Sequence, residues 1–306
     1  MPSSAVLVTG AAGLIGFTLA KKLTEMGRPV IGTDTVRPDE DGGFRFVRAD
    51  LSDVHRIHAM FAEGVDAVAH CGAVSGPMLG RDNPRMVVES NLVGTANILE
   101  AARIHKTRRV IYCSSTSAYG DSTKSATNLD EFAPLSPTDI YGATKAGGDI
   151  LTRAYRVSAG VDGIVLRFCW VFGPRRRTEC VIRQMLKDAQ AGRPTTLPYG
   201  GGFHRQYVYI DDVVGALLKA IDVNAVNQPA YNITAGVRSS FEDIVKQVKA
   251  LYPMAAITLT QGADPQDQVH ARFEVAAAAR ELGWTPQWPF DKGLAAYAKW
   301  LESHPI

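Results

Sequence analysis

AVLVTGAAGLIG, residues 5–16, joins a short apolar run to a turn that contains three glycines. The apolar run predicts a buried strand, and the apolar positions over Leu14–Met26 predict a helix. Gly10 permits a tight turn, Gly13 lets the backbone approach a pyrophosphate, and Gly16 lets the helix pack closely on the strand. The N-terminus of this helix offers unpaired N–H groups to phosphates. The segment therefore predicts a dinucleotide-binding turn.

An acidic residue follows at the distance that such a site requires, about 20 residues beyond the glycine turn. Asp34 ends the second predicted strand, Pro29–Asp34. Its carboxylate can accept hydrogen bonds from the adenosine ribose and would repel a 2′-phosphate, which favours NAD over NADP. The alternative is that Asp34 only caps a turn. Asp50 and Leu51 close the third predicted strand, Phe44–Asp50, and are expected at the adenine end of the pocket.

Strand-like and helix-like segments alternate along the first half of the chain. Short apolar strands separated by amphipathic helices predict right-handed βαβ units. The fold class is therefore α/β, with a Rossmann-type, doubly wound parallel sheet and helices on both faces. The further predicted strands are Val65–His70, Arg108–Ser115 and Asp162–Phe168, and the further helices are Ser52–Phe61, Pro84–His105 and Thr138–Ser158.

The alternation weakens after residue 173. A Pro/Gly-rich loop is predicted over 195–206, followed by a strand and a helix over 207–221, with Asp211 or Asp212 as the N-cap. Short strands and helices beyond Tyr231 predict a smaller lobe. We expect an NAD-binding domain over 1–173, which also receives part of 203–235, and an interleaved C-terminal substrate-binding lobe over 174–306.

Length and charge exclude several classes of protein. The 306 residues are enough for about two domains. A formal net charge of +2 is too small to indicate nucleic acid or an anionic membrane as the main partner. No apolar run reaches the ~18 residues of a membrane-spanning helix, so no membrane partner is expected. No basic segment precedes the first apolar run, which predicts a cytoplasmic protein.

Cysteines and histidines indicate no metal site. Cys71, Cys113, Cys169 and Cys180 are scattered singly, without the paired spacing of zinc ligands or of a redox dithiol. Small buried apolar residues are the expected role, and a catalytic thiol is the less favoured alternative. The two histidines of the helix over 52–61 have no third ligand nearby in the sequence.

A tyrosine and a lysine share one face of a predicted helix. Tyr141 and Lys145 are four residues apart, so their side chains project from the same side. Ser115 ends a predicted strand at the carboxyl edge of the sheet, where ligands bind in such folds. A tyrosine four residues before a lysine is common by chance. Together with the glycine turn, Asp34 and Ser115, in this order along the chain, the pair indicates a catalytic site.

With these residues in place, the chain resembles the extended short-chain dehydrogenase/reductases, the NAD-dependent epimerases and dehydratases. The resemblance covers nearly the whole chain. It implies the Rossmann-type fold described above and an NAD cofactor. It is carried by TGAAGLIG, the DL after strand three, HCGA near Ala73, NLVGTANILEAA (91–102), SSTSAYG (114–120), YGATK (141–145), FGPR (172–175), RQYVYIDDV (205–213) and LGWTP (282–286).

The resemblance also implies roles for individual residues. Tyr141 would be the general acid/base, and Lys145 would stabilise its phenolate and hold the nicotinamide ribose. Ser115 would hydrogen-bond the reacting oxygen. Asn91 would contact the cofactor and support this edge of the site, or would only make a hydrogen bond inside its helix. The remaining cofactor contacts implied are Leu14, Ile15, Ala73 and Phe168.

Some of the residues expected to contact substrate match the pattern of the family, and others depart from it. Relatives that act on nucleotide-sugars usually carry asparagine where this chain has Trp170 and Cys180. Arg205 and Arg272 match positions that contact a diphosphate, although both could equally form surface salt bridges. Ser75 and Thr116 are further candidate substrate contacts. A dehydratase is disfavoured, because Thr116 and Ser117 replace an acidic pair.

Three functions remain open at this point. The favoured one is an NAD-dependent oxidoreductase acting on a secondary alcohol of a carbohydrate- or polyol-like substrate. The alternative is a nucleotide-sugar (UDP-sugar type) 4-epimerase that retains NAD, and the least favoured is a non-catalytic NAD-sensing protein. The helices over 84–105 and 138–158 show wide apolar faces, and their counterparts in the family pair across a twofold axis, so we expect a homodimer. Ordinary core packing would explain the same faces.

Overall fold

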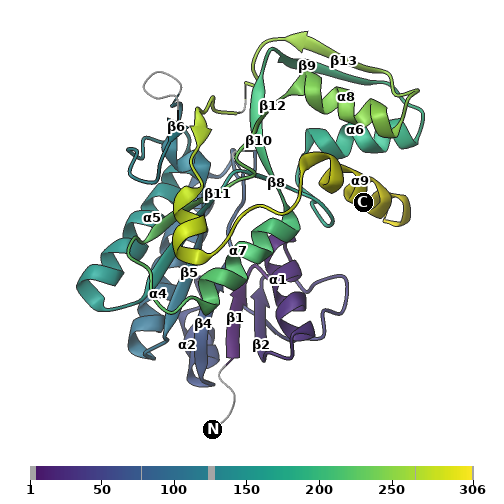
Figure 1. The fold of residues 1–306 in the computed structure, drawn as a ribbon. Coiled ribbons are helices and arrows are strands. Elements are labelled where there is room, and N and C mark those ends of the chain that lie inside the picture. Colours follow the sequence, from purple (N-terminus) through teal and green to yellow (C-terminus); the bar gives the residue numbers. More distant parts are fainter. Residues whose placement is uncertain (1–4, 77, 123–127, 266, 305–306) are drawn as a thin grey trace.

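The computed structural model describes residues 5–76, 78–122, 128–265 and 267–304. A seven-stranded sheet lies at its centre, and every neighbouring pair of strands is parallel. Its strands are β1 (Ala5–Thr9), β2 (Val30–Asp34), β3 (Arg45–Arg48), β4 (Val65–His70), β5 (Arg109–Ser115), β7 (Gly163–Phe168) and β11 (Ala230–Ile233). They are arranged in the order β11-β7-β5-β4-β1-β2-β3 (Figure 1). The predicted doubly wound α/β fold is confirmed.

Helices cover both faces of this sheet. They are α1 (Leu14–Glu25), α2 (Val54–Ala62), α4 (Gly94–Ile104), α5 (Ile140–Ala159) and α7 (Ile210–Asp222). Helices α1 and α7 pack together on one face, and α2, α4 and α5 pack on the other. Strand β1 shows the division clearly, because Val6 and Val8 join the core under α1 and α7 whereas Leu7 joins the opposite core.

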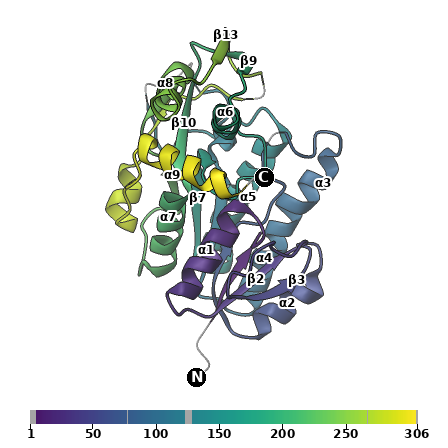
Figure 2. The same cartoon turned by 90° about the vertical axis from the view of Figure 1, so that its right-hand side faces the viewer.

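A smaller lobe follows the sheet and contains most of the remaining elements. Figure 1 shows β9, β13, α6 and α8 grouped beyond one end of the sheet. Helix α9 packs against α6, α8 and β10 and runs across this side of the molecule (Figure 2). The lobe elements are β8 (Trp170–Phe172), α6 (Val181–Gln190), β9 (Thr195–Gly201), β10 (His204–Tyr209), β12 (Arg238–Ser240), α8 (Phe241–Leu251), β13 (Ile257–Gln261) and α9 (Phe290–Ser303). Strand β14 (Arg272–Phe273) and η3 (Ala278–Leu282) follow β13 in the chain, and η3 packs on α7 and β11 instead.

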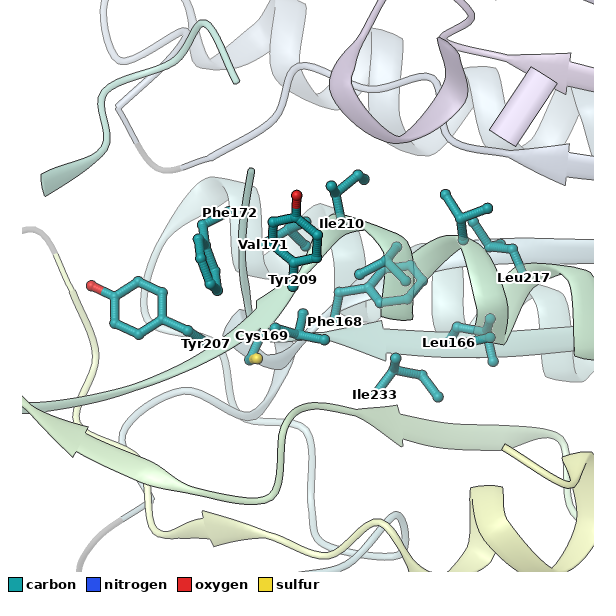
Figure 3. Packing of buried hydrophobic residues seen from close by; sticks show 14 of the residues in the cluster. Leu166, Phe168, Cys169, Val171, Phe172, Tyr207, Tyr209, Ile210, Leu217 and Ile233 are labelled. Carbon is teal, nitrogen blue, oxygen red and sulfur yellow. The ribbon is translucent and has the colours of Figure 1, made fainter. Parts of the chain in front are cut away.

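The sheet and the lobe share one hydrophobic core. Leu166 and Phe168 of β7 belong to the same buried cluster as Phe172, Tyr207 and Tyr209 of the lobe (Figure 3). The chain also returns to the sheet after β10, because α7 packs on α1 and β11 pairs with β7. Since protein interiors are close-packed, a continuous core fixes the lobe relative to the sheet.

The helix predicted over 84–105 is confirmed over 84–104, where a π-helical turn η1 (Glu89–Val93) separates α3 (Pro84–Val88) from α4. Two other local predictions were wrong. The N-cap of α7 is Tyr209, because the Asp212 carboxylate instead accepts hydrogen bonds from the backbone of Gln287 and Trp288. The loop expected over 195–206 contains β9 and the start of β10, whose partner strands β13 and β12 come much later in the chain.

The remaining short elements are η2 (Thr116–Tyr119) and β6 (Asn128–Leu129), which pairs with β14. None of the helices in the described part of the chain combines the length and apolar character that crossing a membrane requires. This finding matches the lack of long apolar runs in the sequence.

A buried ion pair ties α5 to the sheet and supplies a test of stability. Arg167 Nε donates to Asp149 Oδ2 at 2.7 Å, and Arg153 Nε donates to the other oxygen at 2.8 Å. The Arg167 side chain is 1% exposed and that of Arg153 is 38% exposed. Arg167→Met should therefore lower the free energy of unfolding by about 3 kcal/mol, and Arg153→Met by at most ~1 kcal/mol.

Urea denaturation of both variants measures this difference. The two substitutions remove the same charge from the same carboxylate, so each serves as the control for the other. Equal losses of stability would contradict the role of burial in this pair.

Candidate functional site

A cavity of about 640 Å³ lies along the carboxyl ends of the parallel strands, against the lobe. This is the edge at which ligands bind in doubly wound sheets. Most of the residues singled out in the sequence line it: Gly10, Gly13, Leu14, Ile15, Gly16, Asp34, Asp50, Leu51, Ala73, Ser75, Ser115, Thr116, Tyr141, Lys145, Phe168 and Trp170. Asn91, Arg205 and Arg272 do not line it.

The glycine turn leaves the start of α1 open toward the cavity. Gly10 has φ +68°, and a Cβ on Gly16 would lie 2.2 Å from the Gly10 carbonyl oxygen, so both positions need glycine. The N-cap, Gly13, provides no side-chain hydrogen bond, and no acidic residue lies in the first turn. The N–H groups of the first turn are therefore left for an anion.

Asp34 lies at the mouth of this turn and is held by the backbone. Its Oδ2 accepts a hydrogen bond from Ala12 N at 3.0 Å, and its Oδ1 accepts one from Thr35 N at 2.7 Å. The carboxylate thus caps a turn and lines the cavity at the same time. Asp50 is comparable, because its Oδ1 accepts hydrogen bonds from Ser52 N and Oγ, both at 2.8 Å.

Helix α5 presents Tyr141 and Lys145 to the cavity. Its N-cap is Asp139, whose carboxylate accepts a hydrogen bond from Gly142 N at 2.8 Å. Lys145 is 4% exposed, and its Nζ donates to the Cys113 carbonyl oxygen at 2.7 Å. The same Nζ lies 5.9 Å from the centroid of the Tyr141 ring.

The Lys145 ammonium keeps its charge in this buried position. Burial lowers the pKa of Lys145, but the electrostatic effect of the neighbouring Tyr112 and Tyr141 side chains raises it by more. The pKa therefore lies above the usual lysine value. Its Nζ also lies 5.1 Å from the centroid of the Tyr112 ring. A buried positive charge therefore lies beside the Tyr141 ring.

Ser115 reaches the cavity but its hydroxyl is engaged. It is the N-cap of η2, where its Oγ accepts a hydrogen bond from Ser117 N and donates one to Ser117 Oγ, both at 3.1 Å. A bound hydroxyl could replace Ser117 Oγ as the acceptor at little cost, because one hydrogen bond is exchanged for another.

Asn91 lies behind the cavity wall rather than on it. Its side chain accepts a hydrogen bond from Val74 N at 2.7 Å and donates to Val74 O at 3.0 Å and to Thr144 Oγ1 at 3.1 Å. It therefore joins the loop after β4 to α5 close to Lys145. The predicted support of the site edge fits these contacts, whereas the predicted cofactor contact does not.

Arg205 forms salt bridges, as one of its two expected roles had it, but they are buried rather than at the surface. Its Nε donates to Asp267 Oδ2 at 2.5 Å, and its Nη2 donates to Asp264 Oδ2 at 2.8 Å. Its guanidinium also lies 4.2 Å from the centroid of the Trp170 ring, and Trp170 Nε1 donates to Asp267 Oδ1 at 3.2 Å. We call Arg205, Asp264, Asp267 and Trp170 the Arg205 cluster. Arg272 lies outside the cavity, exposed on β14.

The sequence analysis missed two further features of the cavity wall. His270 lines the cavity, its Nε2 is buried without a hydrogen-bond partner, and burial lowers the pKa of its imidazole. Arg175 and Arg177 also line it, and they pair with Glu40 and Asp39 of the loop after β2. The basic run PRRRTEC (174–180) was a signal for the arginines, whereas no sequence pattern marked His270.

Known proteins resemble this chain along nearly its whole length. UDP-glucose 4-epimerase of Mycolicibacterium smegmatis is 30% identical over 94% of this chain and 96% of its own. UDP-glucuronate 4-epimerase of Thermodesulfobacterium geofontis is 26% identical over 97% and 96%. The solved structure of MoeE5 in complex with UDP-glucuronic acid and NAD has a TM-score of 0.88 and 27% identity, with 98% and 99% of the two chains covered.

The sequence profile described as the NAD dependent epimerase/dehydratase family matches residues 6–234. This match spans the glycine turn, the loop after β4, η2 and the Tyr141/Lys145 helix. The resemblance predicted from the motifs is confirmed, and the chain is an enzyme that belongs to the NAD dependent epimerase/dehydratase family.

Proposed function

We propose that this enzyme uses NAD to oxidise a secondary alcohol of a sugar substrate, with Tyr141 as the general acid/base. One observation carries the proposal: a single cavity joins the open N-terminus of α1 and Asp34 to Tyr141 and the buried, charged Lys145. The N-terminus of α1 and Asp34 suit the binding of a dinucleotide. Tyr141 and Lys145 suit proton transfer.

The chain has donors and acceptors that fit NAD from one end to the other. The uncapped N–H groups at Leu14 and Ile15 would hold the pyrophosphate, and the Asp34 carboxylate would accept the adenosine ribose hydroxyls. The adenine end is lined by Asp50 and Leu51. NAD supplies a hydride acceptor when it is bound.

Each catalytic side chain has one task in this scheme. Tyr141 takes the proton of the substrate hydroxyl and returns it when the reaction runs backwards. The Lys145 ammonium would stabilise the negative charge that develops on the Tyr141 oxygen when the side chain gives up its own proton. Ser115 turns its hydroxyl from Ser117 to the reacting oxygen and orients it toward Tyr141.

The similar proteins support a nucleotide-sugar 4-epimerase as the first candidate. The two curated relatives are UDP-sugar 4-epimerases by name, and MoeE5 was solved with UDP-glucuronic acid. An epimerase returns the hydride to the other face of the transient ketone, so the cofactor is never released. Thr116 and Ser117, which line the cavity, provide hydroxyls rather than carboxylates, which disfavours dehydration.

The Arg205 cluster favours a second candidate, a dehydrogenase acting on a smaller sugar without a nucleotide. Two carboxylates, Asp264 and Asp267, surround one guanidinium, so the cluster as a whole is negative. A diphosphate would have to displace these carboxylates to reach Arg205, against electrostatic repulsion. The pocket beside the cluster holds only about 10 Å³, roughly the space of one water.

The proposal extends to domain roles and assembly. Residues 1–173, with α7 and β11, would hold NAD, and the rest of 174–306 would hold substrate. Exposed apolar side chains on α3, η1 and α5 support a homodimer through these helices: Met86, Val88, Val93, Ile150 and Val157.

Cofactor preference tests the place of Asp34. The wild-type enzyme should bind NAD at least tenfold more tightly than NADP, a difference of about 1.4 kcal/mol. Asp34→Ser should reduce this preference, because the carboxylate no longer repels a 2′-phosphate. Fluorescence titration with both reduced cofactors measures it, and equal affinities in the wild type would remove Asp34 from this role.

Substitution of Tyr141 tests the proton transfer. Tyr141→Phe should lower turnover by roughly 10²–10⁴ and leave NAD binding unchanged, whereas Lys145→Met should weaken both. Tyr155→Phe is the matched control, since Tyr155 lies on the same helix but its hydroxyl donates to Glu100 outside the cavity. If Tyr141→Phe retained more than about a tenth of the rate, another group would be the base.

One set of measurements separates the two candidates. A 4-epimerase should retain NAD through purification, bind UDP in the micromolar range and interconvert UDP-sugars without net NADH formation. The purified protein is therefore analysed for bound NAD, titrated with UDP by calorimetry, and assayed for NADH with free sugars. Millimolar UDP affinity together with NADH formation from an unphosphorylated sugar would establish the second candidate instead.

The same titration examines the Arg205 cluster. Asp264→Asn should tighten UDP binding about tenfold if Arg205 contacts the diphosphate, because one competing carboxylate is neutralised. Asp188→Asn, a change of the same kind on α6, is the control. No difference between them would place the diphosphate elsewhere.

A further inference from the structure

Two cysteines that the sequence keeps far apart meet in the wall of the cavity. Cys71 directly follows β4 and Cys113 lies in the neighbouring strand β5, where His70 is paired in register with Tyr112. The Cys113 thiol donates a hydrogen bond to Cys71 Sγ at a sulfur–sulfur distance of 3.4 Å. Both thiols are free and both residues line the cavity. The spacing of the cysteines in the sequence gave no sign of this contact.

The backbone geometry permits a disulfide between them. Neighbouring strands lie about 4.7–4.9 Å apart, within the range of Cα separations that disulfides span. The two sulfurs need to approach by about 1.4 Å from their present 3.4 Å to reach bonding distance. Closing this gap combines rotation of the two side chains with a small approach of the backbone at Cys71 and Cys113. Cys169 also lines the cavity, but its thiol does not contact another cysteine sulfur among the described residues.

We propose that Cys71 and Cys113 form a peroxide-sensitive dithiol whose closure to a disulfide inactivates the enzyme reversibly. The thiolate of Cys71, the more exposed of the two, attacks a peroxide oxygen; the S–O bond forms, the O–O bond breaks, and water leaves after protonation. The Cys113 sulfur then attacks the sulfenic sulfur and releases a second water. Two thiols lose two electrons and two protons, and the peroxide is reduced to two waters.

The surroundings make this a slow reaction rather than a rapid one. The hydrogen bond with Cys113 and burial raise the pKa of the Cys71 thiol well above its ordinary value, although the Lys145 ammonium acts in the opposite direction. The thiolate fraction at neutral pH is therefore small, and reaction requires sustained exposure to peroxide.

A disulfide here would join two segments on which the site depends. The Cys113 carbonyl oxygen accepts the hydrogen bond that fixes Lys145 Nζ. Next to Cys71, Gly72 N donates to Thr9 Oγ1, and a Cβ on Gly10 would lie only 2.8 Å from Gly72 Cα. Drawing the two cysteines together therefore shifts the contacts of both Lys145 and the glycine turn.

The test is peroxide treatment of the NAD-free protein, followed by peptide mass mapping and an activity assay. We expect a Cys71–Cys113 crosslinked peptide lighter by two hydrogens, a loss of turnover of about tenfold or more, and recovery with dithiothreitol. Cys71→Ser and Cys113→Ala should abolish both the crosslink and the sensitivity. Cys169→Ala and Cys180→Ala are the matched controls and should remain sensitive. Sensitivity is the ratio of treated to untreated activity within each variant, so altered basal activity does not affect it.

Three outcomes would overturn the proposal: no crosslinked peptide, a crosslink that leaves turnover unchanged, or sensitivity that persists in Cys71→Ser and Cys113→Ala. A final arm rests on the proposed function, because NAD in the cavity should cover the pair and slow its oxidation. If the crosslink forms and inactivates equally fast with saturating NAD, the redox site stands and the placement of NAD over it fails. The two ideas are thus tested separately.

Discussion

The parallel direction of all seven strands of the central sheet is the constraint on which the rest of this enzyme depends. Parallel strands end at one common edge, so the residues that follow β1, β2, β4, β5 and β7 are brought together although they are distant in sequence. The glycine turn, Asp34, Cys71 and Ser115 all follow or end such strands. The cavity is the meeting place of these strand ends, and the lobe closes its far side.

Tyr141 and Lys145 face the cavity only when helix α5 packs at this edge in one orientation about its own axis. Lys145, Asp149 and Thr152 lie on the same buried side of the helix. The ion pair of Asp149 with Arg167 of β7 therefore fixes the helix in register with the sheet. At the N-terminus of α5, Gln268 Nε2 donates to Asp139 Oδ2 at 2.8 Å, so a loop of the lobe also holds the N-cap of this helix.

Two of the buried cations, Arg205 and Lys145, are compensated in different ways. Arg205 is matched by two carboxylates, so its charge is already neutralised where it lies. Lys145 instead contacts a carbonyl oxygen and two aromatic rings, and it forms no salt bridge among the described residues. An ammonium without a carboxylate keeps its charge available for a phenolate. This difference supports the roles proposed for the two residues, with Lys145 beside the general acid/base and Arg205 as a poor contact for a diphosphate.

The sequence by itself determined the features that rest on local patterns: the α/β alternation, the glycine turn, Asp34 at the end of β2, and the Tyr141/Lys145 spacing on one helix face. Each depends on residues within a few turns or one strand, where periodicity and turn chemistry act directly. Only the tertiary structure decided which distant groups meet. The pairing of β9 with β13, the carboxylates around Arg205, His270 in the cavity wall and the contact between Cys71 and Cys113 all join segments separated by dozens of residues. Strand order and lobe packing bring these groups together, and no local pattern records them, because side chains that meet through packing need share no spacing along the chain.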